Sequence, residues 1–414
     1  MQKIGDNTLR NKIVFVIFLG LALLMWLMAI YGGDSSYADE KTHLRQINRF
    51  LKGNYYLLSD LTTIPGYHLT IASVVSGAGF FIDLSATREI RLVSLFISIA
   101  SIWIFFLISK QLGIKNPYLR TLQFIFLPIS FFYFPFIYTD IFSLILVLVA
   151  FYFLLKKRYN SSAFFIFLSL LVRQTNIVWA AFFWFYIYIS DYGFAFSLNS
   201  FKKHLHQTIG YICTGSLFGL FVFLNHGISI GDRTNQQVGF HLGNVYFFLV
   251  IACILFLPLT LISLVSLFKI KTRKIKLHRG LILNIIAGGL IAVSFVFFIP
   301  ALHMYNLKMR FLRNIVLQQA YHQYIFLYAL AIFFGYLTIF QLKFEKKILS
   351  VFPFVLASII PSLLIEQRYY IIPLTFMLLF RKETGAKKEY ILLFYFFALS
   401  AGLIYMLLKF ELFF

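Results

Sequence analysis

A small set of polar side chains stands at the edges of long apolar runs, in a chain of 414 residues of which only 13% are charged. The polar clusters are Asp39–Glu40, Asp60–Gly66, Tyr138–Asp140, Arg173–Asn176, Gly231–Arg233 and Glu366–Tyr370. A carboxylate can act as general base on a hydroxyl group, and an arginine can bind phosphate through paired, charge-assisted hydrogen bonds. Together these groups favour transfer of a group from a lipid phosphate to a hydroxyl.

The composition of the whole chain indicates a polytopic membrane protein. Hydrophobic residues make up 60% of the sequence and aromatic residues 20%, and the mean hydropathy is +0.83. Soluble proteins carry about 25% charged residues, so a water-soluble enzyme is excluded. We expect an all-α membrane bundle in which interfacial helices and spans hold the polar clusters.

The net charge of +22 resembles that of a nucleic-acid-binding protein, but the positions of the basic residues favour another explanation. With the N-terminus inside, most Lys and Arg residues fall in short cytoplasmic loops, as the positive-inside rule predicts. We therefore expect membrane lipids as partners and no nucleic acid.

The apolar runs predict how often the chain crosses the membrane. A spanning helix needs roughly 20 apolar residues, and fewer where protein surrounds it. The candidate spans are Ile13–Tyr31, Ile90–Ile108, Thr121–Ile137, Ile141–Leu155, Ser162–Val172, Ile177–Ile189, Thr208–Asn225, Val245–Phe268, Leu281–Pro300, Gln323–Gln341, Ile348–Ile365, Tyr369–Phe380 and Tyr390–Leu408. Gly66–Ile82 is also apolar, but the Lys and Arg distribution favours an interfacial or re-entrant helix there. This leaves about 13 spans in a single domain, residues 1–414, without a separate soluble domain.

The external loop, residues 32–89, begins with a segment that has helical periodicity. Apolar residues recur at three- and four-residue spacings in Asp39–Gly53, at Leu44, Ile47, Phe50 and Leu51. We expect an amphipathic helix that lies at the membrane interface.

The predicted topology rests on Lys and Arg residues, yet it brings all of the polar clusters to the same, non-cytoplasmic side. This convergence predicts a polar cavity at one membrane face. A transporter would use the same kind of cavity, so spacing alone leaves carrier and enzyme open. Each cluster also has a structural interpretation: Asp140 as a helix N-cap, Glu366 and Arg368 as an ion pair, and Arg173 as a buried charge that needs a paired acid.

Taken in order, the motifs resemble those of the dolichyl-phosphate-glucose-dependent α-1,2-glucosyltransferases, which add the last glucose to the lipid-linked oligosaccharide of N-glycosylation. The matching stretches are Tyr37–His43 with Gln46, Phe50 and Gly53; Asp60-x-x-Thr63-x-Pro65-Gly66-Tyr67; Tyr138-Thr139-Asp140; Arg173-Gln174-Thr175-Asn176-Ile177-Val178-Trp179; Asn225–Arg233 with His241; and Glu366–Pro373. They extend over most of the chain in the family's order.

The resemblance implies a GT-C-type glycosyltransferase with an inverting, metal-independent single displacement and no cofactor. The donor would be a dolichyl- or polyprenyl-phosphate glucose, and the acceptor a lipid-linked oligosaccharide. Such an enzyme would lie in the endoplasmic reticulum membrane of a eukaryote or the plasma membrane of a prokaryote, with its active site on the non-cytoplasmic face. A lipid-linked sugar flippase, and a GT-C transferase for another polyprenyl-phosphate sugar, stay open as alternatives.

The candidate catalytic base is Asp39, with Asp60 and Glu40 as alternatives on the same external loop. Asp232 is beside Arg233, and Glu366 lies two residues from Arg368. Such an arginine stabilises the ionised carboxylate and makes it a weaker base. Asp39 and Glu40 stand at the start of the predicted helix, where the dipole favours the ionised form. The candidate substrate-binding residues are Asp140, Arg173, Gln174, Asn176, Asp232, Arg233, His241, Glu366, Arg368 and Tyr369.

Overall fold

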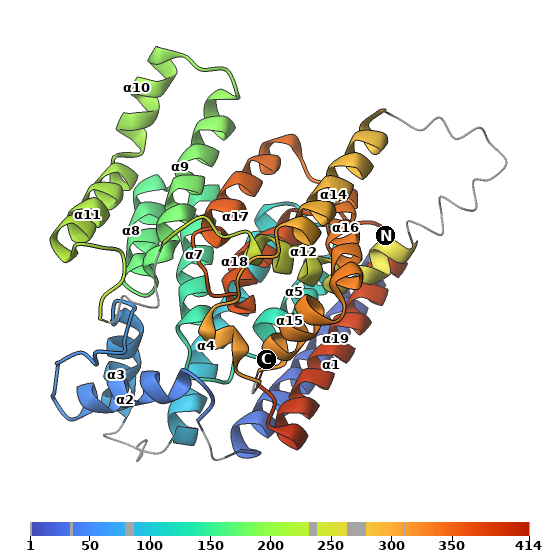
Figure 1. The fold of residues 1–414 in the computed structure, drawn as a ribbon. Helices are drawn as coiled ribbons and strands as arrows, with labels where there is room; N and C mark the ends of the chain where they lie inside the picture. Colours follow the sequence, from blue (N-terminus) through green and yellow to red (C-terminus); the bar gives the residue numbers. More distant parts are fainter. Residues whose placement is uncertain are drawn as a thin grey trace. The chain divides into compact units, whose positions relative to one another are not determined.

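The computed structural model describes residues 2–33, 36–78, 87–231, 238–262, 279–309 and 311–413. Within these ranges the regular structure is helical, apart from two isolated β-bridges, so the predicted all-α class is confirmed (Figure 1). The chain divides into two compact units. The first comprises Met1–Ile125, Ser130–Gln237 and Lys346–Ser358, and the second Phe126–Ile129, Val238–Glu345 and Ile359–Phe414.

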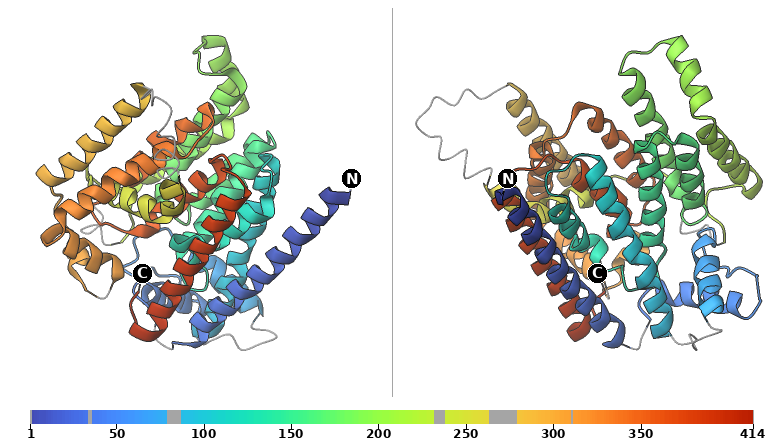
Figure 2. Two further views of the ribbon diagram at one scale, coloured as in Figure 1. Left: turned by 90° about the vertical axis from the view of Figure 1, so that its right-hand side faces the viewer. Right: turned by 180° about the vertical axis from the view of Figure 1, so that it is seen from behind.

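The first unit contains the helices of the N-terminal half. They are α1 (Gln2–Tyr31), α2 (Glu40–Leu51), α3 (Gly66–Ala78), α4 (Thr87–Gln111), α5 (Pro117–Ile125), α7 (Thr139–Leu155), α8 (Tyr159–Leu170), α9 (Ile177–Tyr192), α10 (Leu198–Gln207) and α11 (Ile209–Asn225), with most of α17 (Val351–Ile359). The helix α7 packs against both α4 and α8, and α11 packs against α8. Figure 2 shows α9, α10 and α11 as neighbouring rods.

The second unit is built around α16. Its helices are α12 (Gly243–Leu255), α14 (Arg279–Phe297), α15 (Leu312–His322), α16 (Ile325–Gln341), α18 (Ile371–Phe380) and α19 (Ala386–Phe410). Both α12 and α14 pack against α16. The short helix α6 (Pro128–Phe131) lies where the two units divide.

Within the described ranges, three helices are long and apolar enough to cross a membrane alone: Leu9–Tyr31, Thr87–Gln111 and Ala386–Phe410. Two bent pairs, α10 with α11 (75°) and α15 with α16 (113°), qualify if each is one span. The protein is therefore an integral membrane protein, but the predicted count of about 13 spans is not confirmed. Many apolar runs form shorter helices because they end at polar clusters, as α8 ends before Arg173 and α17 before Glu366.

One predicted span, Thr121–Ile137, is not a continuous helix. The helix α5 ends at Ile125, and α6 begins at Pro128, because proline lacks an N–H and disfavours a helical residue before it. The residues of this segment are all buried within the protein. Trp26 of α1 donates from Nε1 to the Phe131 carbonyl oxygen at 3.0 Å, so this broken segment serves as an internal packing surface.

The predicted amphipathic helix is confirmed as α2, and its apolar face packs against protein. Ile47 and Phe50 belong to one buried cluster with Tyr67 and Ile71 of α3 and with Ile90 of α4. The views in Figure 2 show α2 beside α3. The apolar face was therefore correctly placed on the helix, but its partner is protein.

Candidate active site

A fully buried ion pair anchors the start of α2. The carboxylate of Glu40 accepts from Arg91 of α4 through both oxygens, from Nε at 2.9 Å and from Nη2 at 2.7 Å. The same oxygens accept from the Ile137 N–H (3.1 Å) and the Tyr37 N–H (3.0 Å). Both side chains are 0% exposed. Glu40 therefore uses its acceptor sites within the protein, and no sequence pattern indicated Arg91 as its partner.

Asp39 has a different environment, although it precedes Glu40 directly. It occupies the N-cap position of α2, and its side chain is exposed and makes no capping hydrogen bond to the helix. Its carbonyl oxygen accepts from the Thr42 N–H at 3.0 Å and from the His43 N–H at 3.1 Å. The first turn of α2 thus holds the Asp39 backbone in place, and the exposed residue stands at the helix end that stabilises a negative charge.

Asp60 contacts the exposed side of α2. Its Oδ2 atom accepts from Arg45 Nη2 at 2.5 Å and from the Thr42 hydroxyl at 3.2 Å. The side chains of Arg45 and Asp60 are about half exposed, at 51% and 49%. This pair can therefore rearrange at low cost, because exposed ion pairs contribute little to stability.

The loop from Asp60 to Gly66 is held on two sides by other motifs. The Gly66 N–H donates to the Leu171 carbonyl oxygen at 2.9 Å, and a Cβ at Gly66 would lie 2.5 Å from that oxygen. The Gln174 amide and the Ile230 N–H both donate to the Thr62 carbonyl oxygen, at 3.2 Å each. The first unit thereby brings together motifs that are far apart in the sequence.

Gly231 explains why the Asn225–Arg233 motif approaches this loop so closely. Gly231 has φ +62°, and a Cβ there would lie 2.4 Å from the Leu61 carbonyl oxygen and 2.6 Å from that of Ser59. A glycine accepts both the left-handed conformation and the contact. Two candidate substrate-binding residues, Asp232 and Arg233, lie outside the described residues.

Asp140 and Arg173 form the second ion pair of the first unit. Asp140 is the second residue of α7, after the N-cap Tyr138, so the N-cap interpretation is wrong by position. Arg173 Nη1 donates to Asp140 Oδ1, while Oδ2 of Asp140 is buried without a hydrogen-bond partner. Asn176 is buried, and its side-chain amide donates to the Ser143 hydroxyl at 2.7 Å.

The second unit contains a carboxylate between two guanidinium groups. Glu366 is 4% exposed. It accepts from Arg313 Nη2 at 2.9 Å on one oxygen and from Arg368 Nε on the other. The predicted Glu366–Arg368 pair is thus observed, and Arg313 is a second cation that the sequence did not reveal as a partner. The Nε of Arg313 is buried without a hydrogen-bond partner.

Asparagine side chains fix the backbone around Glu366. Asn244 donates to the carbonyl oxygens of Ser362 (2.7 Å) and Leu364 (3.0 Å), and its Oδ1 accepts from the Tyr370 hydroxyl at 2.7 Å. Asn306 forms a pair of hydrogen bonds with the Ile365 backbone, donating at 2.9 Å and accepting at 3.1 Å. These contacts make the segment before Arg368 rigid.

The remaining candidates of the second unit lie on the same framework. The Tyr369 N–H donates to the Glu366 carbonyl oxygen at 3.2 Å, and the His241 N–H donates to the Ile360 carbonyl oxygen at 3.0 Å. His241 itself is partly buried. Among the described residues, no three His, Cys, Asp or Glu side chains form a group that could hold a metal ion.

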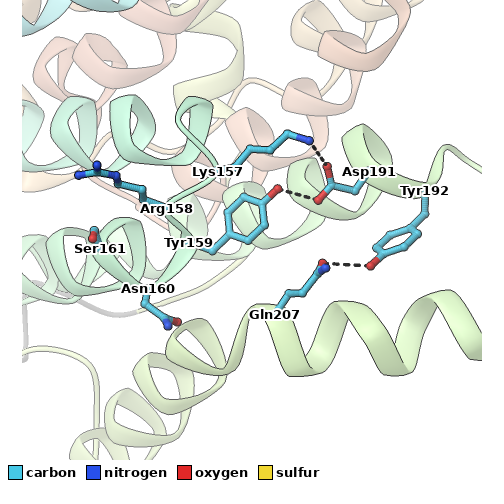
Figure 3. Close-up of a pocket in the computed structure, with 8 residues that line it drawn as sticks. All are labelled: Lys157, Arg158, Tyr159, Asn160, Ser161, Asp191, Tyr192 and Gln207. Carbon is cyan, nitrogen blue, oxygen red and sulfur yellow. Dashed lines mark hydrogen bonds and ion pairs between the residues drawn. The ribbon is translucent and has the colours of Figure 1, made fainter.

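A cavity of about 680 Å³ opens elsewhere in the first unit (Figure 3). It is lined by Lys157, Arg158, Tyr159, Asn160, Ser161, Asp191, Tyr192 and Gln207. Asp191 accepts from the Tyr159 hydroxyl at 2.6 Å and pairs with Lys157 Nζ at 3.6 Å. None of the predicted site residues lines this cavity, so the hollow and the motif cluster are separate features.

The sequence is similar to known membrane enzymes. A profile of the DIE2/ALG10 family matches residues 34–195 and 189–379. A human protein, Dol-P-Glc:Glc(2)Man(9)GlcNAc(2)-PP-Dol alpha-1,2-glucosyltransferase, is 27% identical over 394 residues, covering 81% of this chain and 82% of its own. The Candida albicans protein of the same name is 27% identical over 417 residues, covering 89% of both chains.

Solved structures of one further protein are also similar. ArnT from Cupriavidus metallidurans, bound to undecaprenyl phosphate, has a TM-score of 0.42 and 16% identity. The match covers 83% of this chain and spans 62% of the ArnT chain. The apo form of ArnT has a TM-score of 0.43 and 14% identity.

Proposed function

This chain belongs to the DIE2/ALG10 family, and from that premise we propose that it is a membrane glycosyltransferase. It transfers glucose from a dolichyl- or polyprenyl-phosphate glucose donor to a lipid-linked oligosaccharide, and it forms an α-1,2 linkage. The family match over most of the chain supports the reaction. The observation that carries the proposal is the gathering of the first-loop carboxylates, the Asp60–Gly66 loop and the Asp140–Arg173 pair in one unit.

Asp39 is the proposed catalytic base. Its exposed carboxylate at the start of α2 is accessible to a hydroxyl, and the helix end favours the ionised form that a base requires. Asp60 is the alternative, because its contact with Arg45 is exposed and can be exchanged. Glu40 is the least suited of the three candidates, since the hydrogen bonds from Arg91 and two backbone N–H groups occupy its oxygens.

Arg173 and Arg368 are proposed to bind the donor phosphate, together with Arg233. A guanidinium presents five N–H donors in a planar fork that matches phosphate geometry. The partial exposure of Arg173 (16%) and Arg368 (14%) supports such contacts. The remaining proposed substrate-binding residues are Asp140, Gln174, Asn176, Asp232, His241, Glu366 and Tyr369.

The reaction balances as a single displacement. The acceptor hydroxyl oxygen attacks the anomeric carbon of the β-linked glucose, and the bond from that carbon to the phosphate oxygen breaks. The proton of the hydroxyl passes to the Asp39 carboxylate, and the lipid phosphate leaves with its negative charge stabilised by the guanidiniums. One displacement inverts the β-linked donor into an α-linked product.

The proposed setting is a GT-C-type architecture with a single catalytic domain, residues 1–414. The active site faces the non-cytoplasmic side of the membrane, which is the luminal side in the endoplasmic reticulum of a eukaryote and the external side of a prokaryotic plasma membrane. This orientation rests on the positive-inside distribution of Lys and Arg.

A transfer assay with purified protein tests the function. Protein in detergent is incubated with a radiolabelled lipid-phosphate glucose and a lipid-linked oligosaccharide, and the product is digested with linkage-specific glucosidases. We expect the acceptor to gain one hexose that an α-1,2-specific enzyme removes. An acceptor of unchanged mass, combined with translocation of the donor in proteoliposomes, would instead identify a flippase. Transfer from a different polyprenyl-phosphate sugar only would replace glucose as the donor.

A further inference from the structure

Two histidines that are 25 positions apart in the sequence meet between α2 and α3. Nδ1 of His43 and Nε2 of His68 lie 2.9 Å apart, at hydrogen-bonding distance. His43 is 7% exposed and His68 is 0% exposed. The pair is therefore a buried polar contact within the apolar surface that joins the two helices of the first loop, and neither member was among the candidate site residues.

We propose that His43 and His68 are positioning residues whose hydrogen bond fixes the carboxylate-bearing start of α2 on the Pro65–Gly66 turn. The inference rests on the proposed function, since it assigns this pair the task of holding Asp39 in place for the transfer. His43 lies one helical turn after Asp39, and His68 lies in the first turn of α3, two residues after Gly66.

The mechanical link from the pair to Asp39 is short. The His43 N–H donates to the Asp39 carbonyl oxygen at 3.1 Å, so a displaced His43 moves the N-cap directly. On the other side, the Gly66 N–H is bonded to the Leu171 carbonyl oxygen, next to the segment that carries Arg173. The histidine bond is thus a buried polar connection between the Asp39 turn and α3, in addition to the exposed contacts of Thr42 and Arg45 with Asp60.

The environment of His68 favours its neutral imidazole. Tyr138 and Tyr67 pack edge-on against His43, at ring-centroid distances of 5.6 and 6.3 Å, and Tyr67 also packs against His68 at 5.5 Å. Glu40, three residues before His43, is paired with Arg91 of α4. Burial, and then the proximity of His43, lower the pKa of His68 well below its usual value of 6.5.

Because His68 stays neutral, its charge does not change with pH in the neutral range. Because the pKa of His68 is lowered in the folded protein, the unfolded chain takes up a proton more readily as pH falls below about 6.5. The stability that the neutral pair contributes is present above that pH and is lost as pH falls toward the folded-state pKa. Nδ1 of His68 is buried without a hydrogen-bond partner, so no protein group offsets the charge of a protonated ring there.

Matched substitutions separate the hydrogen bond from packing. A glutamine amide can reproduce the Nε2 position of His68, and an asparagine amide the Nδ1 position of His43, so His68→Gln and His43→Asn preserve the bond. His68→Phe keeps the ring and removes the bond. His204→Phe is the control, because His204 is also 0% exposed in the first unit but packs between α9 and α10, against Trp184 and Tyr188.

The expected result is a loss of kcat without a loss of donor binding. Misplacement of a reacting group by about 1 Å can cost about 100-fold in rate, so His68→Phe should lower kcat about 10- to 100-fold and change the donor KM less than about twofold. His68→Gln should recover most of kcat, and His204→Phe should leave it unchanged. In the wild-type protein, the temperature of unfolding should decrease as the pH is lowered below about 6.5. In the double variant His43→Asn/His68→Gln, the contribution of this pair to that decrease should be absent.

Hydrogen exchange of the α2 backbone gives a readout that does not depend on activity. His68→Phe should speed exchange in residues 40–51, and His68→Gln should not. Normal kcat and unchanged exchange in His68→Phe would overturn the positioning role, as would an equal loss of kcat in His68→Phe and His204→Phe. A wild-type protein without glucose transfer would overturn the proposed function, while the exchange measurement would still test the clamp.

Discussion

Glu40 in the first unit and Glu366 in the second are both buried glutamates bound to arginine, but they differ in the number of guanidiniums that contact them. Glu40 has one guanidinium, that of Arg91, and both side chains are 0% exposed. Glu366 has two guanidiniums, those of Arg313 and Arg368, and one of the two is 14% exposed. Glu40 and Arg91 form a one-to-one pair in which every acceptor of the carboxylate is occupied, whereas the carboxylate of Glu366 is shared between two guanidiniums.

The difference indicates how to tell an anchoring ion pair from an anion-binding one. Backbone N–H groups of Tyr37 and Ile137 complete the hydrogen bonds of Glu40, so removal of Arg91 would leave an isolated buried charge. At Glu366, loss of one arginine leaves the other in place. The Asp140–Arg173 pair lies between these cases, with one carboxylate oxygen still without a partner.

The largest effect on stability is expected at the anchor. Arg91→Met leaves the Glu40 carboxylate buried and uncompensated, and breaking a buried pair in this way costs about 3–5 kcal/mol. Thermal unfolding in detergent measures this loss. The double variant Arg91→Met/Glu40→Leu should recover a large part of it, since no charge then stays unpaired. A loss below about 1 kcal/mol in Arg91→Met would show that the two pairs do not differ as described.

A smaller effect, on binding rather than stability, is expected from Arg368→Lys. The ammonium keeps the charge but cannot make a bidentate contact with phosphate. Hydrogen bonds to charged groups contribute about 1.5–3 kcal/mol, so the donor KM should rise roughly tenfold or more while the unfolding temperature stays nearly constant. Arg45→Lys is the matched control on an exposed pair. An unchanged donor KM in Arg368→Lys and in Arg173→Lys would remove the phosphate role from both.

The smallest effect is expected for the exposed pair Arg45–Asp60. Both side chains are about half exposed, and such pairs contribute less than about 1 kcal/mol. Arg45→Ala should therefore change the free energy of unfolding by less than that amount, and the change should shrink further as added salt screens the pair. A loss as large as that of Arg91→Met would mean that the first loop depends on this pair rather than on Glu40.

The local features of the first loop could be predicted from the sequence because they depend on neighbours along the chain. The periodicity of Leu44, Ile47 and Phe50 identified α2, and the Pro65–Gly66 pair marked the start of α3. The Glu366–Arg368 contact was also predictable, since the two residues are two positions apart. These features need no knowledge of the tertiary structure.

The partners from distant segments could not be predicted. Arg91 stands within a predicted span and pairs with a carboxylate 51 positions away, and Arg313 reaches Glu366 across 53 positions. The interruption of Thr121–Ile137 had a local signal in Pro128, but hydropathy alone favoured one span. In each case the tertiary contact determines the role of the residue, and one sequence does not contain that information.

The central claim is that Asp39, exposed beside the anchored Glu40, removes the proton of the acceptor hydroxyl. A single-turnover assay of Asp39→Asn, with donor affinity measured separately, tests it most directly. Removal of a general base costs about 10²–10⁴ in rate, so kcat should fall by that factor while donor affinity stays nearly constant and the protein stays folded. If Asp39→Asn keeps more than about a tenth of the wild-type rate and Asp60→Asn does not, the base is Asp60 and the claim is contradicted.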